Sequence, residues 1–131
     1  MTNLETIKEM YGDYGRGDLP SILAKLAPDV SFEFEAPAAL AYGGIRKGIN
    51  EVPAFFMGLV DEYSDPVLDM TEFVVSGESV AVFGRYQTTD KATSVRVDSP
   101  LAHLFLFKDG KVIRFVGLLN SGALIEARRA K

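Results

Sequence analysis

The sequence predicts an α+β domain in which helices cover one face of a mostly antiparallel sheet. Apolar residues recur at helical spacing through most of the N-terminal half, whereas after about residue 66 they alternate with a period of two. The order of elements contains no repeated βαβ units, so a parallel doubly wound sheet is not expected. A length of 131 residues fits one domain that spans 1–131.

Two helices are expected before the first strand. Thr2 and Glu5 have the spacing of a capping box, and the first helix is expected to end near Gly15. Asp18 is then placed to cap a second, short helix that stops before Pro28. The apolar stripe of the first helix consists of Leu4, Ile7, Tyr11 and Tyr14.

A strand, a loop and a third helix should follow. Alternation of apolar and polar residues predicts a half-buried strand over 30–37, and the glycine-rich segment 38–48 is interpreted as a loop. Asn50 is expected to cap the third helix, whose first turn tolerates Pro53. The predicted buried side of this helix is Phe55, Phe56, Leu59, Val60 and Tyr63.

The second half of the chain predicts a meander of four strands. They are expected near 67–75, 79–89, 95–107 and 111–119. Asp109-Gly110 is a strong hairpin signal between the last two strands, because both residues accept the left-handed backbone of a tight turn. Segment 121–129 is expected to add a short terminal helix with arginines at its C-terminal end.

One strand of the meander is apolar on both faces. His103, Phe105 and Phe107 alternate with Ala102, Leu104 and Leu106. The helices of the same chain can cover one face, and a second copy of the chain is the simplest cover for the other. We therefore expect a homodimer formed through the outer face of the sheet.

Composition excludes several classes of function. The chain has no cysteine and one histidine, so thiol chemistry and metal sites built on histidine pairs are excluded. A net charge of -4 argues against a nucleic-acid partner. Neither a signal peptide nor an apolar run of about 20 residues is seen, so we expect a cytoplasmic protein without a membrane partner. No metal and no cofactor are expected.

Four segments in order resemble the NTF2-like superfamily, in particular its SnoaL-like and ketosteroid-isomerase-like branches. They are residues 14–18, 26–32, 42–48 and 102–112, and the resemblance extends from residue 3 to about 127. It implies a cone: a curved sheet wrapped around three N-terminal helices, with an apolar pocket inside. It also implies dimers formed through the sheet, and enzymes that use acid–base groups in the pocket without a metal or an organic cofactor.

The resemblance directs attention to three positions of the pocket. It places His103 among the acid–base groups, although a core histidine with a purely structural role remains the alternative. At the position of the family's general base this chain has Phe34, flanked by Glu33 and Glu35, which point to the other face unless a bulge re-aims one of them. Where the family's cyclases carry an acid, the chain has Asn120, which either orients a ligand or caps the last helix.

The sequence therefore predicts a protein that binds a small apolar or mixed-polarity organic molecule. As an enzyme it would be a cofactor-free isomerase, cyclase or dehydratase that moves protons on a carbonyl compound, with His103, Asn120 and Tyr11 as its catalytic candidates. The alternative is a ligand-binding or assembly module without catalysis, because both family carboxylate positions are vacant. The predicted pocket wall consists of Tyr14, Phe32, Phe34, Phe55, Phe56, Leu59, Tyr86, Phe105, Phe115 and Leu119.

Overall fold

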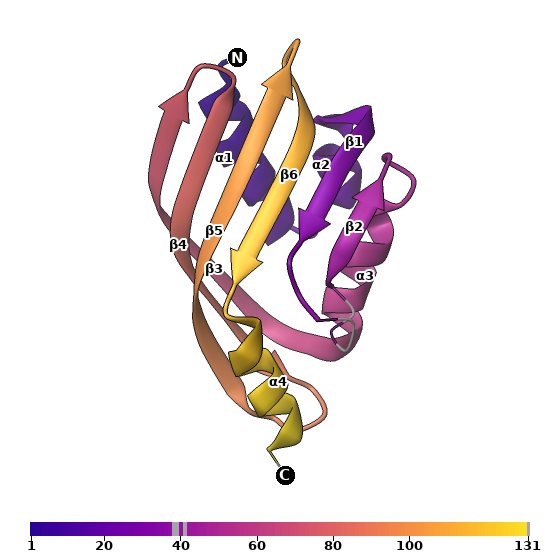
Figure 1. Cartoon of the computed structure of the whole chain (residues 1–131), viewed down its shortest axis with the longest axis vertical. Helices are drawn as coiled ribbons and strands as arrows, with labels where there is room; N and C mark the ends of the chain where they lie inside the picture. The colour runs from indigo at the N-terminus through magenta and orange to yellow at the C-terminus, as the bar shows by residue number, and fades with distance from the viewer. Residues whose placement is uncertain (38–39, 41, 131) are drawn as a thin grey trace.

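The structure, a computed structural model, describes residues 1–37, 40 and 42–130. Within these residues, four helices pack against one sheet of six strands (Figure 1). In chain order the elements are α1 (Asn3–Gly15), α2 (Leu19–Ala24), β1 (Leu26–Phe34), β2 (Gly44–Lys47), α3 (Val52–Glu62), β3 (Tyr63–Ser76), β4 (Ser79–Asp90), β5 (Arg96–Lys108), β6 (Lys111–Leu119) and α4 (Ser121–Arg129). The α+β class predicted from the sequence is confirmed.

The sheet has the strand order β2-β1-β6-β5-β4-β3. Strands β3 to β6 form the predicted antiparallel meander, and β2 pairs antiparallel with β1. The pairing of β1 with β6 is parallel, so the sheet is mixed although most of its neighbours are antiparallel. This pairing joins the first strand of the chain to the last and completes the wall of the cone.

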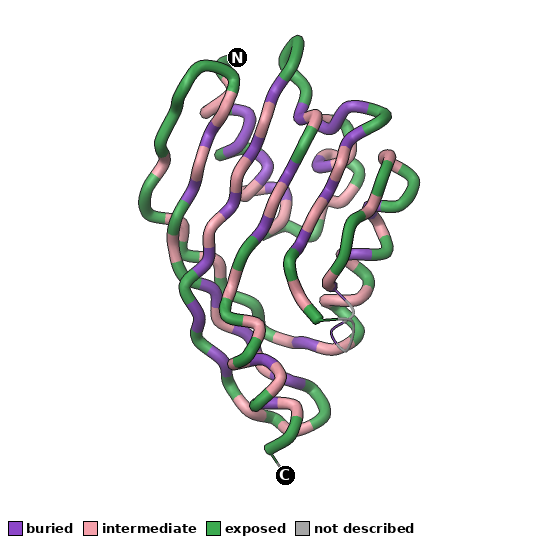
Figure 2. Tube along the Cα trace, in the orientation of Figure 1, coloured by how far each residue is buried: buried purple, intermediate pink, exposed green. Residues whose placement is uncertain are grey.

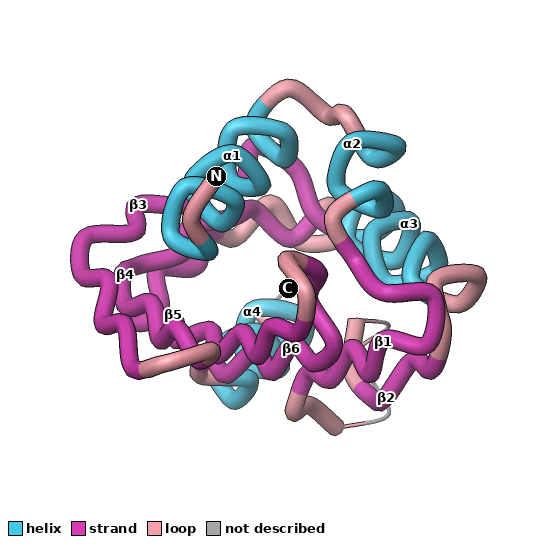
Figure 3. The backbone as a smooth tube through the Cα atoms, turned by 90° about the horizontal axis from the view of Figure 1, so that it is seen from above, coloured by secondary structure: helices cyan, strands magenta, loops and turns pink. Residues whose placement is uncertain are grey.

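The sheet curves around α1, α2 and α3, which lie on its concave side, while α4 lies at one end (Figures 1 and 3). Along β5 the burial alternates: His103, Phe105 and Phe107 are buried, and the residues between them are only partly covered (Figure 2). The buried set faces the helices. The strand therefore presents its two apolar faces as the sequence predicts.

The first two helices begin where the sequence indicates. The Thr2 hydroxyl accepts the backbone N–H of Glu5 at 3.1 Å, and the Glu5 carboxylate accepts the N–H of Thr2 at 2.8 Å. Asp18 accepts the N–H of Ser21 at 3.2 Å and caps α2. The bonds from the N–H groups of Glu5 and Ser21 satisfy donors that a helix leaves unpaired at its start, so the predicted caps are confirmed.

Helix α3 differs from the prediction at both ends. Its N-cap is Glu51 rather than Asn50, and no side chain caps it, because the helix starts at Val52 and Pro53 already lacks an N–H that would need a partner. Val60 is 67% exposed, so its predicted burial is wrong. Tyr63 is buried as predicted, but as the first residue of β3.

The predicted loop 38–48 contains a strand that the sequence does not reveal. Residues Gly44–Lys47 form β2 at the edge of the sheet, where their side chains are mostly exposed, so no apolar alternation marks them. The loop positions 38, 39 and 41 lie outside the described residues. The neighbouring strand β1 starts at Leu26 and ends at Phe34, and Pro28 falls in an irregular stretch of its pairing rather than at the end of a helix.

An ion pair with a buried carboxylate helps to fix helix α4 to the sheet. Arg128 Nε lies 2.6 Å from a carboxylate oxygen of Asp90, which is fully buried. Burial would raise the pKa of Asp90, but the Arg128 guanidinium and the N–H groups of Ala92 and Thr93 lower it below its ordinary value. The carboxylate therefore stays charged and holds the helix across the end of the cone.

Candidate active site

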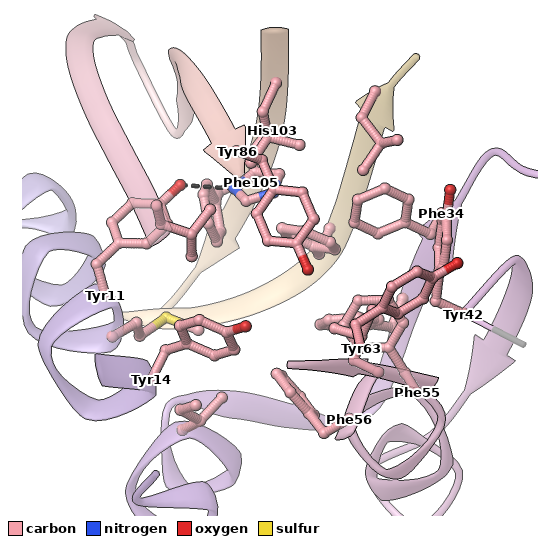
Figure 4. Close-up of a pocket in the computed structure, with 18 of the residues that line it drawn as sticks. Tyr11, Tyr14, Phe34, Tyr42, Phe55, Phe56, Tyr63, Tyr86, His103 and Phe105 are labelled. Carbon is pink, nitrogen blue, oxygen red and sulfur yellow. Dashed lines mark hydrogen bonds between the residues drawn. The ribbon is translucent and has the colours of Figure 1, made fainter. Parts of the chain in front are cut away.

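A cavity lies between the three N-terminal helices and the concave face of the sheet (Figure 4). The volume open to the centre of a water-sized molecule is ≈ 90 Å³. One water needs about 10–15 Å³ on this measure, so the space suits a small organic group. The lining residues are Met10, Tyr11, Tyr14, Ile22, Phe32, Phe34, Tyr42, Phe55, Phe56, Leu59, Tyr63, Leu68, Tyr86, Leu101, His103, Phe105, Phe115, Leu119 and Leu124.

The lining is aromatic and uncharged. All five tyrosines of the chain take part in it, together with six of the nine phenylalanines. Among the described residues that line the cavity, none is Asp, Glu, Lys or Arg. A ligand here meets apolar walls, a few hydroxyl groups and one imidazole, so an uncharged planar molecule with few polar atoms fits best.

His103 is held at the centre of this lining by Tyr11. The Tyr11 hydroxyl oxygen lies 2.7 Å from Nδ1 of the imidazole, and the two rings are nearly parallel with centroids 5.8 Å apart (Figure 4). The rings of Phe34, Phe105 and Phe115 surround the imidazole with centroids 4.8–6.1 Å away. The hydrogen bond and the packing together fix the orientation of the ring.

Burial keeps both partners of this pair neutral. It lowers the pKa of His103 to about 3, because the aromatic surroundings disfavour the imidazolium. It also raises the pKa of the Tyr11 hydroxyl, so that group keeps its proton at neutral pH. Around pH 7 His103 is therefore a neutral imidazole, a poor proton acceptor but a competent hydrogen-bond donor.

The hydrogen bond links the tautomer of His103 to the role of Tyr11, because a hydroxyl group can donate or accept. When Tyr11 donates to Nδ1, the proton of the neutral ring sits on Nε2. When Nδ1 donates to Tyr11, Nε2 is an acceptor. Every fully enclosed side-chain nitrogen or oxygen of the described residues has a hydrogen-bond partner, and none is found for Nε2, so Nε2 borders the cavity. Nε2 therefore faces the ligand space, and it is an N–H donor in the tautomer in which Tyr11 donates to Nδ1.

The other four tyrosines divide into two pairs. Tyr42 donates to the Ser121 hydroxyl at 3.3 Å, and the Tyr63 hydroxyl accepts from Arg128 at 3.4 Å, so both are tied to α4. The hydroxyls of Tyr14 and Tyr86, in contrast, point into the cavity (Figure 4), although the Tyr86 hydroxyl also interacts with the Thr88 side chain. These two hydroxyl groups border the same space as Nε2 of His103.

The position of the family's general base is filled by an aromatic ring. Phe34 points inward and lines the cavity, stacked on Phe55 with centroids 5.3 Å apart. Its neighbour Glu33 lies on the opposite face, where one carboxylate oxygen is 2.7 Å from Arg114 Nε. Glu35 is exposed at the end of β1. The irregularity in the pairing of β1 falls before Ser31 and turns neither glutamate inward.

Asn120 lies outside the cavity lining. Its side-chain oxygen accepts the N–H of Ala123 at 3.3 Å and caps α4. The structure thus favours the capping role that the sequence left open. It leaves the predicted catalytic role of Asn120 without a contact to the cavity.

The structure brings the remaining predicted site residues together. Tyr11, His103 and the ten predicted wall residues all line the one cavity described above. Seven further lining residues have no place in the predicted site, namely Met10, Ile22, Tyr42, Tyr63, Leu68, Leu101 and Leu124. Several of these stand at the ends of elements or in the segment before β2. Periodicity carries little information there. Signals exist for Met10, three positions after Ile7 in α1, and for Leu101, two positions before His103 in β5.

No candidate metal centre is found. Nowhere in the part of the chain that the structure describes do three or more His, Asp or Glu side chains gather closely enough to hold an ion. A membrane-spanning helix is likewise not found among the described residues.

This fold occurs in known protein structures. One, an NTF2-like protein of unknown function from Burkholderia pseudomallei, is 29% identical, with a TM-score of 0.89 over 97% of this chain and 98% of that one. A protein from Jannaschia sp. CCS1, provisionally described as a SnoaL-like polyketide cyclase, is 21% identical with a TM-score of 0.86 over 98% and 92%. TerC, co-crystallised with polyporic acid, is 23% identical with a TM-score of 0.89 over 98% of each chain.

The fold is therefore the NTF2-like cone. Residues 7–115 match the model of the SnoaL-like domain, so the chain belongs to the SnoaL-like family. No curated protein matches the chain in sequence. The resemblance stated from four short segments is confirmed at the level of family and fold.

Proposed function

We propose that the cavity binds a small, uncharged carbonyl compound and polarises its carbonyl group through His103. The observation that carries this proposal is the hydrogen bond of 2.7 Å between Tyr11 and Nδ1 of His103 in an uncharged aromatic cavity. In the proposed state Tyr11 donates this bond, so that the Nε2 proton is directed at the ligand. A carbonyl oxygen is the natural acceptor for that proton and for the hydroxyls of Tyr14 and Tyr86.

Donation from a neutral imidazole supports enolisation of the bound carbonyl. When a proton leaves the carbon next to the carbonyl, negative charge develops on the oxygen, and donors already aimed at that oxygen bind it more strongly than the ground state. The uncharged surroundings strengthen this interaction because no solvent screens it. This chemistry is shared by cofactor-free isomerases, cyclases and dehydratases.

The lining offers an electrophile but no carboxylate base. The proton that leaves the carbon must pass to water or to an oxygen of the substrate itself, because His103 stays neutral to about pH 3. This requirement favours substrates that are already easy to enolise. It also gives weight to the second candidate, a module that binds the same compounds without transforming them.

Labelled acetophenone, a one-ring ketone, tests the first proposal. On binding, its carbonyl stretching frequency should fall, and its methyl protons should exchange with deuterated water faster than in buffer alone. Both effects should be lost in His103→Leu and kept in Tyr42→Phe, because the Tyr42 hydroxyl is bonded to Ser121 instead. A saturating binder at a hundredfold excess over Kd adds about 2.7 kcal/mol to the free energy of unfolding, so a thermal shift reports binding independently.

The outcomes separate the two candidates. Binding with a lowered carbonyl frequency but without faster exchange favours the non-catalytic module. Binding without any frequency change contradicts the role of His103. Polyporic acid, with which TerC was co-crystallised, is a second probe for the same thermal-shift measurement. Failure of both probes to bind would contradict the proposed ligand class.

A further inference from the structure

A second hollow opens on the outer side of the helices. It lies between the α1–α2 connection on one side and α3 with the start of β3 on the other, and its volume on the same measure is ≈ 510 Å³. Figure 3 shows these helices side by side above the sheet. The lining of this groove consists of Tyr14, Gly15, Gly17, Leu19, Ile22, Phe56, Met57, Leu59, Val60, Asp61 and Pro66.

The groove continues the inner cavity. Four residues line both spaces: Tyr14, Ile22, Phe56 and Leu59. The partition between the two spaces is therefore a single layer of side chains. Two of the shared side chains are in contact: the rings of Tyr14 and Phe56 meet at a tilt of 44° with centroids 6.2 Å apart (Figure 4).

The rim of the groove is apolar although it faces solvent. Met57 is 62% exposed and Val60 is 67% exposed on the outer side of α3, and Pro66 is exposed beside them. Asp61 is the sole charged side chain among the described residues of the lining. Val60 would complete the apolar stripe of α3 if it were buried against the core. Instead, its side chain lines the groove. Contiguous exposed apolar side chains of this kind mark binding surfaces.

We propose that this groove holds an apolar tail of the ligand whose carbonyl head lies at His103. The proposal rests on the proposed function, because the head is what places the tail. The inner cavity takes a compact head, and the groove, with a volume inside the usual range for small-molecule sites, takes an elongated hydrocarbon portion. Continuity through four shared residues favours one molecule spanning both spaces over a separate partner on the surface. The substrate class is thus a carbonyl compound with a long apolar substituent.

A series of para-alkyl acetophenones, from methyl to hexyl, tests the tail site. Each methylene that reaches the groove should tighten Kd about twofold to fourfold, the upper value corresponding to complete burial. In Met57→Ser and Val60→Ser the gain with chain length should flatten, so that Kd for the hexyl compound approaches that for acetophenone. Val75→Ser is the matched control, because Val75 is 52% exposed and lines neither space. It should leave the gain unchanged.

The series distinguishes failure of the tail site from failure of the proposed function. A Kd that does not change with chain length, or a gain that Met57→Ser and Val60→Ser leave intact, overturns the tail site while binding of acetophenone itself still stands. Strong binding of the hexyl compound without an effect of His103→Leu on the carbonyl frequency overturns the role of His103 and keeps the groove. If Val60→Ser instead changes the mass of the protein in solution, the groove is a contact between copies of the chain and the tail site is wrong.

Discussion

The hydroxyl of Tyr11 and the Nδ1 atom of His103 lie 2.7 Å apart although 92 positions of sequence separate the two residues. The bond joins the first helix to the centre of the sheet inside an uncharged cavity. In the proposed function Tyr11 donates this bond, and His103 then presents its remaining proton to the ligand space. The chemistry proposed for this protein depends on that one contact.

Replacing Tyr11 with Phe should change the tautomer equilibrium of His103 but reduce the stability of the fold only slightly. Loss of one partly buried hydrogen bond is expected to lower the free energy of unfolding by about 1 kcal/mol. Without the Tyr11 proton, neither tautomer of His103 is fixed, so the ring nitrogen chemical shifts should move toward values averaged over both. Tyr42→Phe, which loses a bond to Ser121, should leave those shifts in place. Unchanged shifts in Tyr11→Phe would contradict the assigned donor.

The pH dependence of stability gives a second test. His103 has a pKa of about 3 in the folded protein and an ordinary value near 6.5 when unfolded. Between these values the unfolded chain binds the additional proton. Protonation of His103 therefore leaves the free energy of unfolding unchanged above pH 6.5. As the pH falls from 6.5 toward 3, it lowers the free energy of unfolding by roughly 1.4 kcal/mol per pH unit.

The chain has a single histidine, so its ring resonances are unambiguous. They should show no titration between pH 5 and 8. The difference in unfolding free energy between wild type and His103→Gln should change with pH at the slope expected for the histidine. A midpoint near 6.5 in the folded protein would show that the imidazole is not buried as described.

Gly117→Ala should destabilise the protein through the ring of Phe34. Gly117 lies opposite both His103 and Phe34 in neighbouring strands, and the Phe34 ring crosses its backbone. A Cβ at this position would overlap the ring. We expect a loss of about 1–3 kcal/mol. Replacing glycine by alanine in an open strand would have the opposite sign.

The double variant Gly117→Ala with Phe34→Leu checks the cause. If the clash with the ring produces the loss, the two substitutions should couple and the double variant should regain part of the stability. Additive losses, measured by denaturant unfolding, would place the effect elsewhere.

The homodimer expected from the two-faced apolar strand stays a prediction, and the structure names residues that test it. Phe83 on β4, Ala102 on β5 and Leu118 on β6 lie in register on the outer face, where Phe83 and Leu118 are exposed. Phe83→Glu should convert a species of twice 14.3 kDa into the monomer, as measured by light scattering. Val75→Glu on β3 is the control for an exposed apolar residue off this face, because Val75 lies opposite the buried Val80. A monomeric wild type would rule out the dimer.

Local patterns predicted the elements whose burial repeats along the sequence. The helical stripe of α1, the alternation in β5 and the Asp109-Gly110 turn all follow from side chains that meet a regular core, and the turn shows the expected positive φ at both residues. Strand β2 was not predicted because an edge strand with exposed side chains has no such pattern.

The site was less predictable than the fold because its contacts are long-range. Period-two geometry orients His103, but nothing local indicates that Tyr11 reaches Nδ1 of the ring. Tyr42 and Tyr63 reach the cavity from the segment before β2 and from the first residue of β3, and each position is set by its contacts with α4. Such placements depend on how distant elements pack against one another. The spacing of residues along the sequence does not predict that packing.

The parallel pairing of β1 with β6 has a consequence for the order of assembly. Phe32 and Phe115, whose stacked rings have centroids 4.3 Å apart, come from these two strands and share one wall of the cavity. The wall is incomplete until the last strand has left the ribosome and docked beside the first. Pairings between such distant segments are slow to form. The aromatic interior formed by the earlier elements therefore stays open on this side until β6 has been synthesised and has paired with β1.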